Sequence, residues 1–390
     1  MSDVEALSTR AAGILDRLVA FDTTSRRSNL ELIAFAEDRL KACGASLSRV
    51  ANADGSKANL IARIGPEQAG GVLLSGHTDV VPVDGQAWSS DPFVVAQRDG
   101  RLYGRGTADM KGFLALALAA APDFAAVERP TLPVQFAFTY DEEIGCLGAP
   151  GLIAELTRAG PRPSVVIVGE PTNMEAVSGH KGISTFRVTV LGHEAHSSLT
   201  HLGVSAVMEA VPLMQTLQRL AAELERGADP GSPFMPKGAS LTIGQVKGGT
   251  AVNILARECV FLFDLRVPPG IEPRIILQPF FAQAAALDAA LKARSPDAGV
   301  LVEARSSTPP MGPEADGAAE RLARRLAGDN GPARVVSYAA EAGQFQLAGY
   351  STVICGPGSI EQAHQPDEYL ELAQLQRGAA FMARLVEAMG

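Results

Sequence analysis

A short apolar run followed at once by a histidine and an aspartate constrains the fold more than any other stretch of this sequence. Residues 71–74 (Gly-Val-Leu-Leu) are typical of a buried strand, and His77 and Asp79 come at its carboxyl end. Open α/β sheets place their sites there. Because residues i and i+2 of an extended segment point the same way, the Asp79 carboxylate can orient the His77 imidazole towards a metal. On its own the triplet is more often a polar strand end, so further donors are needed.

Strands and helices alternate on both sides of this stretch. Helices are predicted at 29–43 and 110–121, and strands at 59–64, 134–139 and 164–169. Towards the carboxyl end a further helix, a strand at 351–355 and a closing helix from Leu370 follow. This alternation indicates an α/β fold with a mostly parallel central sheet.

The pattern changes after residue 179. A half-solvated strand near Phe186 leads to a helix at 204–224, strands at 240–246 and 259–267, a helix at 273–292 and a strand at 299–304. The order β-α-β-β-α-β is that of a ferredoxin-like α+β unit. We therefore predict a catalytic domain in two parts, 1–179 and 294–390, interrupted by an inserted domain at 180–293. The strand at 299–304 could belong to the inserted domain or to the second part of the catalytic domain.

Composition and charge exclude several kinds of partner. Hydrophobic residues make up 46% and charged residues 20%, which fits a well-buried globular core. A formal net charge of −9 argues against nucleic acid or an anionic membrane as a partner. The four cysteines are far apart and form no Cys-x-x-Cys motif, so a zinc ribbon and a disulfide framework are excluded. With no leader-like amino terminus and no apolar run long enough to cross a bilayer, we expect a cytoplasmic protein.

Further carboxylates and a second histidine follow the other predicted strands and turns. Asp109 lies in a glycine-rich turn, Glu142 and Glu143 follow the strand at 134–139, Glu170 follows the strand at 164–169, and His364 lies near the carboxyl end. Nitrogen and oxygen donors without a thiolate suit a pair of divalent metals such as zinc. Two metals about 3.5–4 Å apart need a bridging ligand, for which Asp109 is the candidate. Glu143 would bind one metal, while Glu142 would take a proton from the metal-activated water; the alternative is that residues 141–143 are only a solvated loop.

Taken in order, these motifs resemble those of the co-catalytic zinc aminoacylase and carboxypeptidase family: residues 77–82 (His-Thr-Asp-Val-Val-Pro), 106–112, 141–143, 169–172 and His364. The resemblance covers nearly the whole chain, including the insertion. It implies a zinc-peptidase-like catalytic domain, an inserted lid domain that mediates a homodimer, and a cis peptide bond after Asp109. It also implies two zinc ions, for which cobalt can substitute, bridged by Asp109. His77 and Glu170 would bind one ion and Glu143 and His364 the other, with Asp79 behind His77 and Glu142 as the base.

The resemblance extends to residues that would contact the substrate. His196 matches a histidine that, in related enzymes, comes from the partner subunit and stabilises the oxyanion; the alternative is a hydrogen-bonded loop histidine. Asn253 and Arg266 match positions near the substrate. A planar guanidinium donates two parallel hydrogen bonds to a carboxylate, so Arg266 is assigned to the substrate carboxylate. An ion pair with Asp264 is the alternative.

The carboxyl-terminal segment discriminates between substrates. Residues 341–346 and 355–369 are most similar to family members that deacetylate N2-acetyl-L-ornithine in arginine biosynthesis, although Ala340 stands where these usually have threonine. Glu341 is a candidate partner for the cationic side chain, and Gly358 for the substrate carboxylate through backbone N–H groups. The expected products are acetate and L-ornithine. N-succinyl-L,L-diaminopimelate or another N-acyl amino acid is the alternative substrate, and a silent binding protein is disfavoured because every ligand and the base are present.

Overall fold

The computed structural model describes residues 3–390, which form two compact units. The first unit comprises the described residues up to Gly179 together with Met311–Val335 and Ala340–Gly390. The second unit comprises His180–Pro310 and Val336–Ala339. Two short strands, β8 (Gly179–His180) and β13 (Val335–Val336), lie where the chain passes from one unit to the other.

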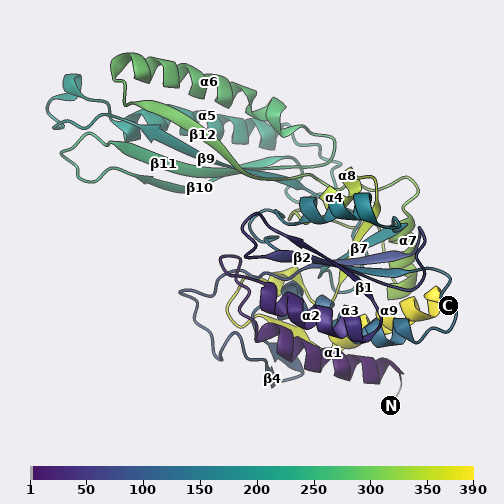
Figure 1. Cartoon of the computed structure of the whole chain (residues 1–390). Coiled ribbons are helices and arrows are strands. Elements are labelled where there is room, and N and C mark those ends of the chain that lie inside the picture. The colour runs from purple at the N-terminus through teal and green to yellow at the C-terminus, as the bar shows by residue number, and fades with distance from the viewer. Residues whose placement is uncertain (1–2) are drawn as a thin grey trace. The chain divides into compact units, whose positions relative to one another are not determined.

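A six-stranded sheet forms the centre of the first unit (Figure 1). Strands β6, β3, β7 and β14 run parallel to one another, whereas β1 and β2 complete one edge in antiparallel pairing. Every residue of β3, β6 and β7 is buried, as expected for strands covered on both faces. The α/β prediction is thereby confirmed. In spatial order the strands are β1 (Ser46–Ala51), β2 (Ala58–Ile64), β6 (Val134–Thr139), β3 (Val72–His77), β7 (Val165–Pro171) and β14 (Ser351–Gly356).

Helices cover both faces of this sheet (Figure 1). One face carries the main hydrophobic core, to which five helices contribute: α1 (Asp3–Val19), α2 (Leu30–Ala42), α3 (Gly112–Ala125), α7 (Ala318–Ala327) and α9 (Leu372–Met389). Helices α4 (Ala149–Ala159) and α8 (Ala342–Leu347) lie on the other face. A small sheet of β4 (Ala96–Arg98), β5 (Arg101–Tyr103) and β15 (Tyr369–Glu371) completes the unit.

The second unit is an antiparallel sheet that packs against two helices. Its elements follow the predicted β-α-β-β-α-β order: β9 (Gly182–Leu191), α5 (Ala206–Arg226), β10 (Ser240–Gly248), β11 (Glu258–Val267), α6 (Pro273–Arg294) and β12 (Gly299–Thr308). In space the strands lie in the order β10-β11-β9-β12. Aromatic rings of the strands and α6 form the centre of its core, where Phe263 stacks on Phe186 and meets Phe280 edge to face.

The end of the insertion differs from our expectation. We placed it at residue 293, whereas the second unit continues to Pro310. The reason is β12, which pairs with β9 from Gly299 to Thr308 and is therefore an integral strand of the second sheet.

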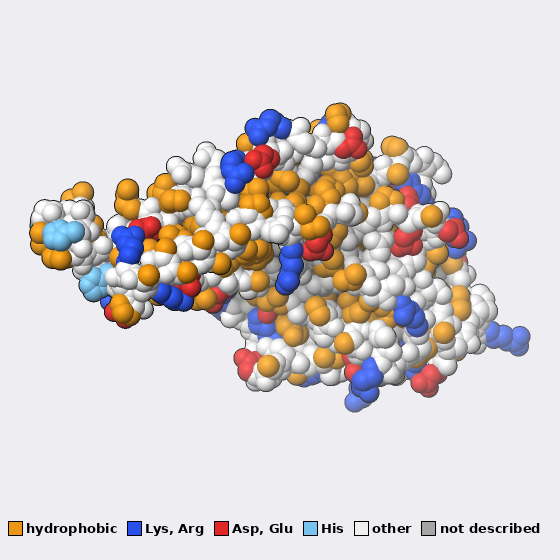
Figure 2. Space-filling view, turned by 90° about the horizontal axis from the view of Figure 1, so that it is seen from above, with side chains coloured by type: hydrophobic (Ala, Val, Ile, Leu, Met, Phe, Trp, Pro, Cys, Tyr) orange, Lys and Arg blue, Asp and Glu red, His pale blue; other side chains and the backbone are white. Residues whose placement is uncertain are grey.

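Acidic and basic side chains are mixed on the face of the molecule that Figure 2 shows. The face drawn in Figure 2 shows acidic and basic groups interspersed with hydrophobic ones. The net charge of −9 is the difference between 43 acidic and 34 basic residues. Within residues 3–390, no helix combines the length and the apolar character that crossing a membrane requires.

Candidate metal centre

Three neighbouring parallel strands deliver polar side chains to one edge of the central sheet. Strand β3 ends at His77, β7 contains Glu170, and β6 leads into the loop that carries Glu142 and Glu143. Because the carboxyl ends of parallel strands lie at the same edge, residues far apart in sequence meet there. The sequence predicted this meeting of strand ends.

The first group of candidate ligands consists of His77, Asp109 and Glu170, all of which are buried. His77 Nε2 lies 3.0 Å from Asp109 Oδ1 and 3.8 Å from Glu170 Oε1. One imidazole nitrogen and two carboxylates thus converge on a space in which one cation could be bound.

The second group consists of Asp109, Glu143 and His364. His364 Nε2 lies 3.0 Å from Glu143 Oε2 and 3.3 Å from Asp109 Oδ2. Asp109 therefore presents one oxygen to each group, which is the arrangement required of a bridging carboxylate. Unlike the other ligands, the His364 side chain is 53% exposed.

The turn that carries Asp109 has an unusual backbone. An irregular turn, η1 (Thr107–Lys111), stands where the first turn of a helix is predicted, because Asp109 and Met110 have non-helical backbone angles; α3 therefore begins only at Gly112. The peptide bond between Asp109 and Met110 is cis, as the resemblance implied. Gly106 precedes the turn with φ of +82°, a conformation that glycine adopts without the steric cost of a side chain.

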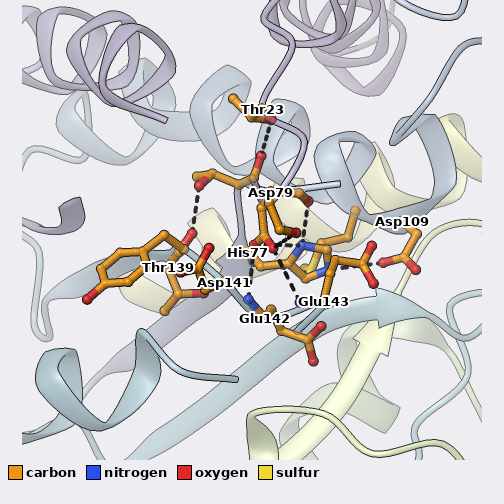
Figure 3. A network of polar contacts seen from close by, with 12 residues as sticks. Thr23, His77, Asp79, Asp109, Thr139, Asp141, Glu142 and Glu143 are labelled. Atoms are coloured by element: carbon orange, nitrogen blue, oxygen red, sulfur yellow. Dashed lines mark hydrogen bonds and ion pairs between the residues drawn. The ribbon is translucent and has the colours of Figure 1, made fainter. Parts of the chain in front are cut away.

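Asp79 supports both His77 and the glutamate loop (Figure 3). We expected its carboxylate to lie against the imidazole, but the backbone carbonyl oxygen of Asp79 is closer, 2.9 Å from His77 Nδ1, and the carboxylate is 3.8 Å away. The carboxylate instead accepts hydrogen bonds from the backbone N–H groups of Glu142 (3.1 Å) and Glu143 (3.3 Å) and from the Ser25 hydroxyl (2.6 Å). Asp79 thus fixes the ring and the loop together.

Glu142 belongs to neither ligand group. Its Oε1 accepts a hydrogen bond from the Cys146 thiol at 3.2 Å. Burial raises the pKa of Glu142 to about 8; His77 opposes this shift, and the charges of Glu143 and Asp109 add to it. A buried, unligated carboxylate with a raised pKa is the group expected of a general base.

The remaining carboxylates and the two histidines shift one another's pKa values. Burial and the charge of Asp109 raise the pKa of Glu143 to about 7 and that of Glu170 well above its ordinary value. Hydrogen bonds with Asp109 and Glu143 raise the pKa of His364 to about 10. Burial also opposes the charge on His77, but Asp109 and the nearby glutamates outweigh it, so the pKa of His77 lies well above its usual value.

Two buried carboxylate oxygens indicate whether the two groups of candidate ligands fit metal ions. Glu143 Oε1 and Glu170 Oε1 are both shielded from solvent and neither has a hydrogen-bond donor. Leaving a buried carboxylate oxygen without a partner is costly, and a divalent cation would satisfy it. Together with the mixed nitrogen and oxygen donors, these atoms show that the two groups fit a pair of divalent cations.

Two residues expected near the substrate also lie in the first unit. Glu341 is 1% exposed, and its carboxylate oxygens accept hydrogen bonds from the hydroxyls of Ser75 (2.6 Å) and Thr139 (2.8 Å). These hydrogen bonds tie Glu341 to β3 and β6, and contact between its carboxylate and a substrate cation stays a prediction. Gly358 follows β14 with φ of +87°, and its carbonyl oxygen accepts the N–H of Asn173 at 2.6 Å.

The other three expected residues lie in the second unit. His196 is exposed, and its Nδ1 lies 2.7 Å from the Ser198 hydroxyl. Asn253 is also exposed, and its carbonyl oxygen accepts the N–H of Ser197. The Arg266 guanidinium lies 3.7 Å from the Asp264 carboxylate, so the ion pair that we considered as an alternative is present, although its length is that of a weak contact.

Sequence reasoning gave no role to Glu368, which contacts the Asp109 turn. Its backbone carbonyl oxygen accepts the Gly104 N–H, and its carboxylate accepts the Asp109 N–H at 3.0 Å. The available signal was its position four residues after His364, in the same loop as a ligand.

The sequence and the structure are similar to those of known proteins. Residues 73–388 match the model of peptidase family M20/M25/M40. An acetylornithine deacetylase from Myxococcus xanthus is 36% identical over 95% of both chains, and one from Proteus mirabilis is 33% identical over 94% of this chain and 92% of its own. A metallo-carboxypeptidase from Sulfolobus solfataricus (TM-score 0.76, 16% identity, 97% and 98% covered) has the same fold. So does a dinuclear metal-binding peptidase from Bacillus subtilis (TM-score 0.66, 16% identity, 99% of both chains).

Proposed function

The chain belongs to peptidase family M20/M25/M40, and from this premise we propose that it removes the acetyl group from N2-acetyl-L-ornithine, giving L-ornithine and acetate. The observation that carries the proposal is the pair of ligand groups sharing Asp109, with the unligated carboxylate of Glu142 beside them. The substrate is inferred from the relatives named as acetylornithine deacetylases, which match this chain over most of its length.

We propose zinc as the metal, with cobalt as a substitute. His77 and Glu170 would hold one ion, Glu143 and His364 the other, and Asp109 both. When bound, such ions polarise an amide carbonyl and make water more acidic. The absence of cysteine from both groups is compatible with zinc, which histidine and carboxylate bind in catalytic sites.

Glu142 is the proposed general base. It accepts a proton from the attacking water and later gives it to the leaving amine. Its backbone N–H is held by Asp79 and its carboxylate by the Cys146 thiol, so it is oriented from two sides. Glu143, the next residue, cannot share this role because its side chain faces His364.

We further propose that three residues of the second unit act on the substrate. Arg266 binds its carboxylate, Asn253 contacts it, and His196 stabilises the oxyanion from the partner subunit of a homodimer. In the first unit, we propose that backbone N–H groups near Gly358 contribute to carboxylate binding. The homodimer would form through the second unit, whose Val252 side chain is fully exposed. The four cysteines form no disulfide, which is compatible with a reducing cytoplasm.

The experiment that tests the substrate compares three amides. We expect zinc-dependent hydrolysis of N2-acetyl-L-ornithine to exceed that of N-succinyl-L,L-diaminopimelate and N-acetyl-L-methionine in kcat/KM. A preference for either of the other two would retain metal-dependent amide hydrolysis and contradict the substrate assignment.

The base is tested separately with Glu142→Ala. We expect kcat to fall by about 10²–10⁴-fold, the usual contribution of a general base, while both metal equivalents remain bound. Metal content is the internal control, because Glu142 lies outside both ligand groups. Undiminished turnover would refute its role.

A further inference from the structure

Glu368 is a buried carboxylate whose two oxygens accept four hydrogen bonds. Oε2 accepts from Arg105 Nη1 (2.7 Å) and from the Gly106 N–H (2.9 Å). Oε1 accepts from the N–H groups of Ala108 (2.9 Å) and Asp109 (3.0 Å). Charge-assisted hydrogen bonds of this kind are the strong ones, and here three of the four hold the backbone of the turn that presents the bridging ligand.

A second branch of the same network reaches His364. Arg105, which is as deeply buried as Glu368, donates from Nη2 to Gln86 Oε1 at 2.6 Å. Gln86 Nε2 in turn donates to the backbone carbonyl oxygen of His364 at 2.9 Å. A continuous chain of hydrogen bonds therefore runs from the Asp109 N–H through Glu368, Arg105 and Gln86 to His364.

This network compensates for the position of His364 outside any helix or strand. His364 has φ of +65° and its side chain is half exposed, so packing alone constrains it weakly. Glu368 lies four residues further along the same loop and is fixed by the Asp109 turn. Gln86 fixes the histidine's own carbonyl oxygen.

We infer that Glu368 is a positioning residue. Directly, and through Arg105 and Gln86, it holds Asp109 and His364 in the positions that ligands of the second cation require. It is not itself a ligand, because N–H donors already engage both of its oxygens. This inference rests on the proposed metal-dependent function. Loss of such an outer partner typically weakens metal binding by about 10–100-fold.

The test is a calorimetric titration of the full-length, chelator-stripped protein with Zn²⁺. Glu368→Gln keeps the shape of the side chain but turns one acceptor into a donor that faces N–H groups. We expect wild type to bind two equivalents, and the variant to bind the weaker equivalent about 10–100-fold less tightly. The matched control is Glu371→Gln, a carboxylate 43% exposed on the same segment, which should leave both affinities unchanged.

Thermal unfolding separates positioning from general stabilisation. A ligand raises the melting temperature in proportion to the free energy of binding. If Glu368 positions ligands, the rise in melting temperature produced by Zn²⁺ will be smaller in Glu368→Gln than in wild type. Equal rises and equal affinities, with only a lower melting temperature of both metal-free and loaded forms, would overturn the inference. Wild type that binds no zinc would instead overturn the proposed function.

A second variant keeps the test decisive if Glu368→Gln does not fold. Gln86→Met replaces a half-buried side chain by one of similar length that can neither donate to His364 nor accept from Arg105. We expect about 10-fold weaker binding of the second equivalent, the lower end of the usual range. Gln97→Met, at an exposed position on β4, is the control. Unchanged zinc affinity in Gln86→Met would overturn the inference.

Discussion

The two candidate ligand groups share Asp109 but are held in place by different means. His77 and Glu170 lie at the ends of neighbouring strands of the central sheet, where the pairing of the preceding residues and burial of both side chains fix them. Glu143 and His364 lie in loops, and hydrogen bonds from distant parts of the chain fix them instead. One half of the centre is therefore set by sheet register, and the other is assembled from long-range polar contacts that single substitutions can undo.

Removal of metal is expected to have the largest effect. Dialysis against a chelator should abolish amide hydrolysis, because the proposed reaction requires the cations that the two ligand groups bind. On stepwise addition of Zn²⁺, the strand-built group should fill first and activity should return in two phases. A parallel sample treated with zinc-saturated chelator is the control. Full activity in metal-free protein would contradict the shared role of the two groups.

Truncation of Glu341 should weaken the support behind the strand-built half. Glu341→Ala removes the acceptor of two buried hydroxyls on β3 and β6, and we expect a loss of about 2–4 kcal/mol in the free energy of unfolding. Urea denaturation measures it. Glu67→Ala, at a side chain 80% exposed, is the control and should cost little.

The same Glu341→Ala variant decides between support and substrate contact. If Glu341 only supports the strands, the kcat/KM ratio of N2-acetyl-L-ornithine to N-acetyl-L-methionine will stay the same. A selective loss for the ornithine substrate would instead support the direct contact with the substrate cation that the sequence predicts.

Substitution of the two histidines should expose the difference between the halves. In metal-free protein, His77→Ala should lower the free energy of unfolding by about 1–3 kcal/mol, because buried partners lose their hydrogen bonds. His364→Ala should cost about 1 kcal/mol at most, since its ion pairs are half exposed. Chemical denaturation with a chelator present measures both. Equal losses would show that the two halves are equally rigid.

The buried His180 of the second unit is a reference for the two histidines of the metal centre. We expect it to have a small effect, on the pH dependence of the free energy of unfolding. Burial lowers the pKa of His180 to about 4, whereas carboxylates raise that of His364 to about 10. The unfolded chain therefore binds a proton near pH 6.5 that folded His180 excludes. The stabilisation is complete above pH 6.5 and declines as the pH falls towards 4. Relative to His180→Gln, wild type should lose about 1 kcal/mol between pH 6 and pH 5; parallel pH profiles would contradict this.

Local pattern was sufficient to predict the strands that deliver the ligands. Strand β6 occupies residues 134–139 as predicted, because a strand buried on both faces is rich in apolar residues, here Val134, Phe136, Ala137 and Phe138. His77, Glu143 and Glu170 were found in a related way, as polar residues after predicted strands, whereas Asp109 was found in a glycine-rich turn and His364 near the carboxyl end. The resemblance of the ordered motifs then implied their roles. Helix α1 (Asp3–Val19) was not predicted, although Leu7, Ile14 and Leu18 show the helical spacing.

Contacts between distant residues could not be predicted in this way. Glu368 and the Asp109 N–H are 259 residues apart, and a hydrogen bond to a backbone N–H leaves no requirement on the donor's side chain. The engagement of Glu341 by Ser75 and Thr139 depends equally on which strands are neighbours. Neither spacing nor composition contains this information, since it arises only when the sheet and its loops have formed.

The insertion of the second unit between β7 and α7 also has a consequence for biosynthesis. A ribosome completes residues 77–170 before it makes the second unit, and adds β14 and His364 only afterwards. Closing the longer loop is inexpensive, since each doubling of loop length costs about 0.6 kcal/mol. A chain that stops within the second unit therefore contains His77 and Glu170 but lacks His364. The second group of candidate ligands is complete only after the carboxyl-terminal part of the first unit has been made.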